Sequence, residues 1–113
     1  MEIGREYHFS AAHHLPFVAD DHKCRRVHGH NYQVFVTVRG DVAENGFCCG
    51  LDFYDIDTAV WLIIDPLDHR NLNDLFQNPT IELVTQYIFD NLPDWCGGVK
   101  IWETPTRWAE VSR

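Results

Sequence analysis

Residues 27–39 constrain the fold more than any other stretch, because they alternate as a β-strand and carry two histidines. The stretch reads Val-His-Gly-His-Asn-Tyr-Gln-Val-Phe-Val-Thr-Val-Arg, and its many β-branched and aromatic residues favour a strand. Residues two apart in a strand point to the same face of the sheet. His28 and His30 therefore project side by side, on the face that also carries Tyr32 and three valines.

A third histidine stands at the end of another predicted strand. Residues 2–12 alternate well enough for a strand that leads into His13, and pairing of the two strands would bring His13 close to His28 and His30. Three imidazoles that leave a fourth position open are typical of a catalytic zinc ion. Alternatively, Cys24 is the fourth ligand, which would close the site and make the zinc structural.

Cys24 also has a chemical context of its own. Lys23, Arg25 and Arg26 flank it, and nearby cations favour the thiolate, the form that acts as a base or nucleophile. The chain as a whole has a formal net charge of −8, which argues against a nucleic-acid-binding protein. The local reversal of sign around Cys24 indicates an anionic substrate; the alternative is a solvated loop.

Two acidic residues are further candidates for the site. Asp68 precedes His69, and a carboxylate can orient an imidazole for acid/base work, although a surface histidine in a loop is common. Glu103 ends the apolar stretch 99–103. There its carboxylate can accept paired hydrogen bonds from a planar ring edge such as that of a guanine or a pterin, or it is simply a solvated strand end.

The remaining pattern predicts two helices and two more strands. Residues 54–64 have helical spacing, as does a segment that begins around residues 78–80 with Asn78 or Thr80 as its N-cap. Residues 99–103 and 108–111 predict strands. The order strand, strand, helix, helix, strand, strand indicates an α+β fold with a four-stranded antiparallel sheet and both helices on one face. We expect residues 1–113 to form a single domain.

The composition also indicates a compartment. The chain has no run of about 18 apolar residues, so no transmembrane helix and no membrane partner are expected. Its N-terminus is charged at once and lacks the apolar stretch of a signal peptide. The four cysteines show no pairing logic, and unpaired thiols are typical of a reducing compartment. We therefore expect a cytoplasmic protein with four free thiols.

Taken together, these residues resemble the 6-pyruvoyltetrahydropterin synthase family. The resemblance runs over nearly the whole chain, and the order and spacing of its motifs are highly specific. The motifs are Phe9-Ser10-Ala11-Ala12-His13, His22-Lys23-Cys24, His28-Gly29-His30-Asn31-Tyr32, Asp52-Phe53, Leu67-Asp68-His69-Arg70-Asn71-Leu72-Asn73, Asn78-Pro79-Thr80-Ile81-Glu82 and Trp102-Glu103-Thr104-Pro105-Thr106.

The resemblance implies a fold, an assembly and a set of roles. The fold is the tunnelling fold (T-fold), in which sheets from several subunits join into a barrel, so the chain would be a homo-oligomer, hexameric or tetrameric, with active sites at subunit interfaces. Asp68 and His69 would be a second acid/base pair that can serve a neighbour's Cys24. The other implied roles are zinc ligand for His13, His28 and His30, catalytic base for Cys24, and substrate binding for Glu103, the pterin anchor, and Thr104 beside it.

One spacing indicates the subfamily. Three residues separate Cys24 from His28, whereas the pyruvoyl-forming enzymes typically have five, so the chain resembles the bacterial 6-carboxytetrahydropterin synthase of the queuosine and 7-deazaguanine route. We therefore expect a zinc-dependent lyase that converts 7,8-dihydroneopterin triphosphate to 6-carboxy-5,6,7,8-tetrahydropterin, acetaldehyde and triphosphate. By their charge, Lys23, Arg25 and Arg26 could attract the triphosphate.

Two other functions stay open at this point. One is a 6-pyruvoyltetrahydropterin synthase, which eliminates triphosphate only, and the other is a non-catalytic zinc- or pterin-binding module. The chain also departs from the family pattern at residues 46–53, where a short segment is lengthened and contains Cys48 and Cys49. This departure affects the local loop rather than the chemistry.

Overall fold

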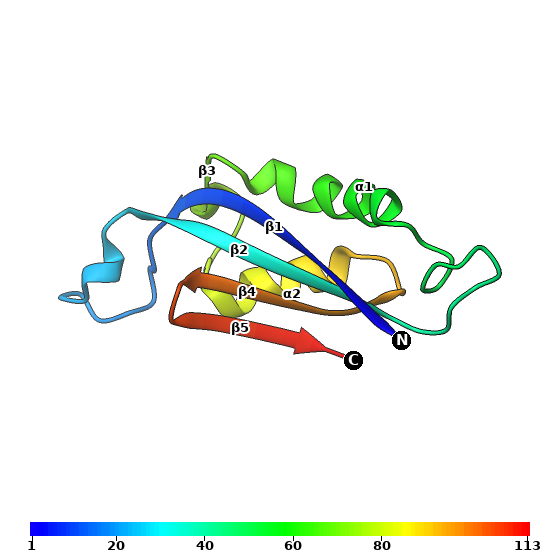
Figure 1. The fold of residues 1–113 in the computed structure, drawn as a ribbon. Coiled ribbons are helices and arrows are strands. Elements are labelled where there is room, and N and C mark those ends of the chain that lie inside the picture. The colour runs from blue at the N-terminus through cyan, green and yellow to red at the C-terminus, as the bar shows by residue number, and fades with distance from the viewer.

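The computed structural model describes residues 1–113 as a curved five-stranded sheet with two helices (Figure 1). The elements are β1 (Glu2–His13), β2 (His28–Arg39), α1 (Phe53–Ile64), β3 (Arg70–Asn71), α2 (Ile81–Asn91), β4 (Cys96–Thr104) and β5 (Arg107–Ser112), with 3₁₀ turns at Lys23–Arg25, Asp65–Leu67 and Leu72–Asp74. The strand order is β3-β1-β2-β4-β5. The predicted α+β class and the order of the long elements are confirmed.

The fifth strand, β3, is a correction to the four-stranded antiparallel sheet that we expected. It pairs with β1 in parallel, Ala11 with Arg70 and Ala12 with Asn71, so the sheet is mixed. The segment before β3 is bound to the edge of β1, because the N–H of Ser10 donates to the Asp68 carboxylate at 2.9 Å and the N–H of His69 donates to the Ser10 carbonyl at 2.6 Å. A two-residue strand has no periodicity, so these tertiary contacts create it rather than a local pattern.

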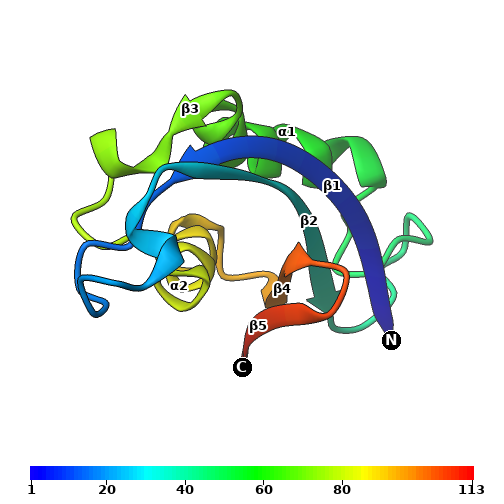
Figure 2. The same ribbon diagram turned by 90° about the vertical axis from the view of Figure 1, so that its left-hand side faces the viewer.

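The register of β1 against β2 decides where the histidines lie. It places His13 opposite His28 and Ala11 opposite His30, and residues directly opposite in an antiparallel pair share a face. The two strands curve together (Figure 2). The molecule measures 57 × 22 × 22 Å. The loop of residues 14–27 lies at one end, and the loop that carries Cys48 and Cys49 lies at the other (Figure 1).

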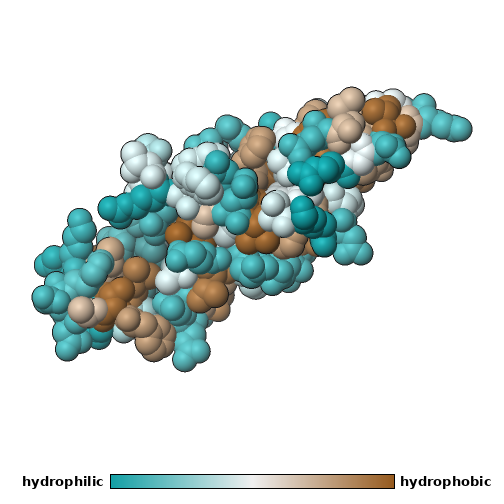
Figure 3. Space-filling view, turned by 90° about the horizontal axis from the view of Figure 1, so that it is seen from below, coloured by the Kyte–Doolittle hydropathy of each residue, from teal (hydrophilic) through white to brown (hydrophobic).

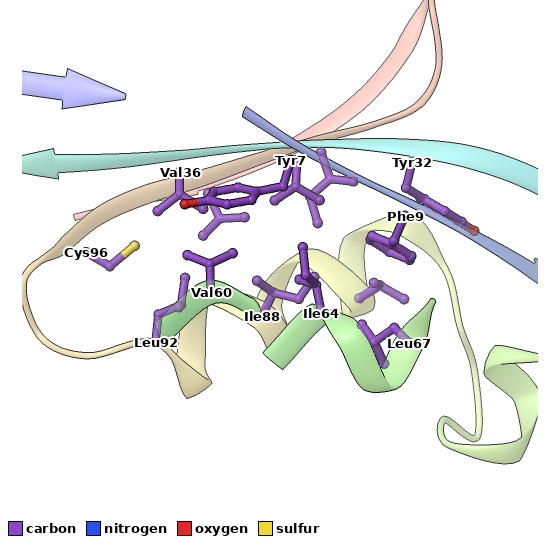
Figure 4. Packing of buried hydrophobic residues seen from close by; sticks show 14 of the residues in the cluster. Tyr7, Phe9, Tyr32, Val36, Val60, Ile64, Leu67, Ile88, Leu92 and Cys96 are labelled. Atoms are coloured by element: carbon purple, nitrogen blue, oxygen red, sulfur yellow. The ribbon is translucent and has the colours of Figure 1, made fainter. Parts of the chain in front are cut away.

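Both helices pack against one face of the sheet, as the pattern predicts (Figure 4). Alternate residues of β1, β2 and β4 and the apolar stripes of α1 and α2 form most of one buried cluster of 19 residues, to which Cys48, Leu67, Leu72 and Leu92 also belong. Each large apolar side chain buried there contributes roughly 1.5–3 kcal/mol. Tyr7 and Phe9 belong to this cluster, and the same alternation along β1 carries His13 inward, where only 1% of it is exposed.

The helices begin at capping residues. Asp52 and Asp55 form a capping box at the start of α1, each accepting the other's backbone N–H. The N-cap of α2 is Thr80, whose hydroxyl accepts the N–H of Leu83 at 3.2 Å, so Thr80 and not Asn78 is the cap. Such a cap contributes about 1 kcal/mol. It also fixes Pro79 at the start of the helix, next to the histidines.

The surface is mostly hydrophilic, with separate apolar groups, in the view from below (Figure 3). All four cysteines are free thiols, as expected. Neither α1 nor α2 is long and apolar enough to cross a membrane.

Candidate metal centre and substrate cavity

Three histidines from β1 and β2 converge at one point, as the sequence predicts. One ring nitrogen from each of His13, His28 and His30 lies within 4.8 Å of the other two. The ring centroids are between 4.6 and 5.0 Å apart. Cys24 is not part of this cluster, so the structure favours an open three-nitrogen site over the closed site that a cysteine ligand would make.

Backbone carbonyl groups orient two of the three rings. Nδ1 of His13 lies 2.9 Å from the carbonyl oxygen of Pro79, and Nδ1 of His28 lies 2.8 Å from that of Arg26. When these nitrogens carry the protons, Nε2 of each ring keeps a free lone pair, which is the usual support for a metal-bound histidine. Nε2 of His13 is buried without a hydrogen-bond partner. A metal ion would satisfy it, so the residues fit zinc.

The protonation state of the rings suits the same role. Burial lowers the pKa of His13, although its hydrogen bond to Pro79 opposes this effect. Burial also lowers the pKa of His30, and the charge of Arg107 adds to the shift while that of Glu103 opposes it. Both rings are therefore neutral near pH 7, and neutral imidazole is the form that binds a metal.

A carboxylate faces the histidine nitrogens. Oε1 of Glu103, at the end of β4, lies 3.5 Å from Nε2 of His13 and 3.5 Å from Nε2 of His30. The pairing of β4 with β5 is irregular between Trp102 and Thr104, which is how a bulge aims a side chain at a strand end. Glu103 can thus accept hydrogen bonds from a ligand that lies against the metal position.

Cys24 and Glu103 line the same cavity as His28 and His30, whereas His13 lies buried behind it. The cavity has a volume of about 840 Å³, which is enough for a cofactor-sized molecule. It is lined by Cys24, His28, His30, Glu103 and Thr104, among others. The backbone holds Cys24 in place, because its N–H donates to Nδ1 of His22 at 3.0 Å and its carbonyl accepts the N–H of Leu15 at 2.7 Å.

The side chains of the three basic residues around Cys24 do not all face the cavity. Lys23 and Arg26 line the cavity. Arg25 turns away from it: its guanidinium donates to the carbonyl oxygens of Pro16 and Val18 at 3.0 and 2.9 Å and pairs with Asp20 at 3.4 Å. In this structure Arg25 braces the loop that carries Cys24.

His69, which pairs with Asp68, lines a second hollow, and His30 lines both this hollow and the cavity of Cys24. Oδ2 of Asp68 is 2.9 Å from Nδ1 of His69, whose side chain is 82% exposed. The backbone hydrogen bond from Ser10, and next the His69 side chain, lower the pKa of Asp68. His69 lines a hollow of about 480 Å³ with Ser10 and Ala12. These two residues alternate with the buried ones of β1, so they lie on the opposite face from His13.

The structure adds two groups that sequence reasoning missed. Arg107, the first residue of β5, lines the cavity with Thr106; the β4–β5 register that brings it there follows from a hairpin and not from a motif. The hydroxyl of Tyr32 is buried without a hydrogen-bond partner. Its ring lies beside those of His13 and His30, with centroids 6.3 and 5.7 Å away.

Comparisons with known proteins show which family the chain belongs to. The sequence model of the family described as 6-pyruvoyl tetrahydropterin synthase matches residues 2–113. A protein of Archaeoglobus fulgidus, provisionally named 6-carboxy-5,6,7,8-tetrahydropterin synthase, is 37% identical over 100% of this chain and 96% of its own length. The 6-carboxy-5,6,7,8-tetrahydropterin synthase of Haemophilus influenzae is 29% identical over 97% of each chain.

A solved structure shows the same fold. The 6-pyruvoyl tetrahydropterin synthase of Caenorhabditis elegans superimposes with a TM-score of 0.89 and 30% identity, over 100% of this chain and 95% of that one. The family match therefore covers the sequence and the fold. This chain belongs to the 6-pyruvoyl tetrahydropterin synthase family and is an enzyme of the tetrahydropterin synthase type.

Proposed function

We propose that residues 1–113 form a single catalytic domain with the activity of a zinc-dependent 6-carboxy-5,6,7,8-tetrahydropterin synthase. The substrate is 7,8-dihydroneopterin triphosphate, and the products are 6-carboxy-5,6,7,8-tetrahydropterin, acetaldehyde and triphosphate. One water molecule is consumed, since the three products together contain its atoms in addition to those of the substrate. The pathway would be the formation of queuosine or another 7-deazaguanine product.

One observation carries this proposal: a single cavity is lined by the Cys24 thiol, the Glu103 carboxylate and two of the three clustered histidines, His28 and His30. The separation of Cys24 from His28 by three residues supports the carboxy-forming reaction over the pyruvoyl-forming one. The names of the relatives from Archaeoglobus and Haemophilus support the same choice.

The residues of the cavity have distinct tasks in this reaction. His13, His28 and His30 would hold zinc, which when bound supplies Lewis-acid polarisation of the side-chain hydroxyls of the substrate. Glu103 accepts N–H groups of the pterin ring and so places the side chain of the substrate beside Cys24. The Cys24 thiolate then removes a proton from a side-chain carbon.

A second proton relay is the task of Asp68 and His69. Oδ2 of Asp68 is 2.9 Å from Nδ1 of His69, but within one chain His69 lines a different hollow from Cys24. We therefore propose a homo-oligomer in which the exposed His69 of one subunit serves the cavity of another. Mixing two inactive variants, Cys24→Ala and His69→Ala, under conditions that exchange subunits tests this. Recovered activity supports shared sites, and no recovery despite proven exchange contradicts them.

Product analysis tests the proposed reaction. The zinc-loaded protein is incubated with 7,8-dihydroneopterin triphosphate, and the products are identified by mass spectrometry. Carboxytetrahydropterin with an equal amount of acetaldehyde is the expected result. Pyruvoyltetrahydropterin without acetaldehyde would agree with the proposed site but contradict the assignment to the carboxy-forming subfamily. The absence of turnover would favour a non-catalytic pterin-binding role. The Cys24→Ala protein, checked for retained zinc, is the control for background decomposition.

A further inference from the structure

The basic residues of this chain differ in whether their charge has a partner. Of the nine basic residues, Arg5, Arg25 and Arg39 form ion pairs with carboxylates. Lys100 lies over the rings of Trp102 and Trp108, and Arg113 donates to the Cys96 carbonyl. The side chains without an ion pair, hydrogen bond or aromatic partner are those of Lys23, Arg26, Arg70 and Arg107.

Three of these unpartnered cations meet in one place. Lys23, Arg26 and Arg107 all line the 840 Å³ cavity, and Glu103 is the one carboxylate among its lining residues. The rest of the chain is strongly acidic, with a net charge of −8. Like charges gathered in a concave site repel one another and concentrate the positive potential there. Such an arrangement is stabilised when a multivalent anion binds.

The β4–β5 hairpin places a negative and a positive anchor close together. Glu103 stands near the end of β4, and Arg107 begins β5 opposite Thr104. The substrate has matching ends, because a pterin ring presents N–H donors and a triphosphate presents oxygen acceptors. A guanidinium also binds phosphate oxygens through paired hydrogen bonds, which a lysine cannot do.

We propose that Arg107, together with Arg26 and Lys23, forms the subsite for the triphosphate chain of the substrate. This inference rests on the proposed function and names the residues that recognise the anionic half of its substrate. Arg25 is not part of the subsite, because its guanidinium is committed to Pro16, Val18 and Asp20. The hairpin then sets the distance between the ring anchor and the phosphate anchor.

The test compares two variants that each lose one positive charge. Arg107→Gln removes the proposed phosphate contact, and Arg39→Gln is the control, because Arg39 is exposed and pairs with Glu2 away from the cavity. Binding of inorganic triphosphate to the zinc-loaded protein is measured by calorimetry. Since triphosphate chelates metals, the zinc content is measured before and after each titration.

We expect Arg107→Gln to weaken triphosphate binding by about tenfold or more, the usual effect of losing a hydrogen bond between charged groups. Arg39→Gln should change it by less than about twofold, as expected for a screened surface charge. Both variants should bind 7,8-dihydroneopterin, which has no phosphate, as the parent protein does. In turnover, Arg107→Gln should raise KM more than it lowers kcat.

Other results separate this inference from the proposed function. If Arg107→Gln binds triphosphate as the parent does, if both variants lose affinity equally, or if the parent does not bind triphosphate, the subsite is overturned. Any of these results can accompany normal turnover, which leaves the proposed function standing. The opposite combination is also possible: Arg107→Gln alone loses triphosphate binding, and the parent protein forms no carboxytetrahydropterin. This result would support the anion subsite and reject the proposed reaction.

Discussion

Two substitutions of Asp68 separate its structural role from the catalytic role that we propose for it. Oδ1 of Asp68 accepts the N–H of Ser10, and Oδ2 pairs with His69. Asp68→Asn keeps an acceptor for Ser10 but replaces the charged partner of His69, whereas Asp68→Ala removes both. We expect both variants to lose activity, because His69 is no longer oriented. Only Asp68→Ala should also release β3 from the edge of β1.

The structure gives the size of the expected difference in stability. A hydrogen bond to a charged group contributes about 1.5–3 kcal/mol and a neutral one about 0.5–1.5 kcal/mol. The Asp68 side chain is 30% exposed, so screening by water favours the lower ends of these ranges. Asp68→Ala should therefore lower Tm by about 6–8 °C and Asp68→Asn by about 2–4 °C, at about 4 °C per kcal/mol for a chain of this size.

The pH dependence of this contribution has a definite sign. The N–H of Ser10, and next the His69 side chain, hold the pKa of Asp68 below its usual value. The ionised carboxylate therefore stabilises the fold above the unfolded-state pKa of about 4, and this contribution is lost as the pH falls through the lowered folded-state pKa. The difference in stability between the parent and Asp68→Asn should close in acid.

Thermal unfolding followed by circular dichroism, at one fixed protein concentration because subunit association would shift Tm, measures these differences. Turnover is measured on the same samples. Equal losses of Tm in the two variants would contradict the assigned bond to Ser10. A difference that persists unchanged in acid would contradict the role of the charge, and an active Asp68→Asn enzyme would remove His69 orientation from the mechanism.

Three further outcomes follow from other contacts. Cys24→Ala should retain zinc and lose turnover, whereas His28→Ala should lose zinc, as metal analysis of the purified proteins would show; zinc loss from Cys24→Ala would make the thiol a ligand. Tyr7→Phe should lower the free energy of unfolding in urea by about 1–2 kcal/mol, because it removes the 2.6 Å hydrogen bond to Asp57; an unchanged midpoint would mean that this bond adds no net stability. Thr80→Ala should cost about 1 kcal/mol in the same assay through loss of the helix cap, while Thr80→Ser should cost little.

The sequence predicts the convergence of the three histidines because one physical rule governs it. The two-residue period of β2 places His28 beside His30 on one face, and the same period in β1 places His13 on that face. Pairing of these consecutive strands then brings His13 opposite His28. The side of the sheet that the helices cover follows from the same alternation. These are local patterns that extend over many residues, so no knowledge of distant contacts is needed to use them.

The parts that escape prediction depend on contacts between distant segments. β3 exists because Asp68 and His69 bond to Ser10, which lies 58 residues from Asp68 along the chain. The different orientations of Arg25 and Arg26, adjacent in the sequence, depend on how the loop folds back on Pro16 and Val18. Arg107 reaches the cavity through the register of a hairpin. The charge pattern of the sequence therefore indicates the basic region around Cys24, but not which basic side chains line the cavity.

The backbone carbonyl groups that contact the histidine rings connect the candidate metal site to two other parts of the fold. Pro79, whose carbonyl contacts His13, directly precedes Thr80, the cap of α2. Arg26, whose carbonyl contacts His28, lies near the end of the loop that carries Cys24. A zinc ion bound by the three histidines would therefore connect the end of β1, the start of β2, the start of α2 and the loop that carries Cys24. Removal of the metal should speed amide hydrogen exchange in the first turn of α2 while leaving the far end of the sheet unchanged.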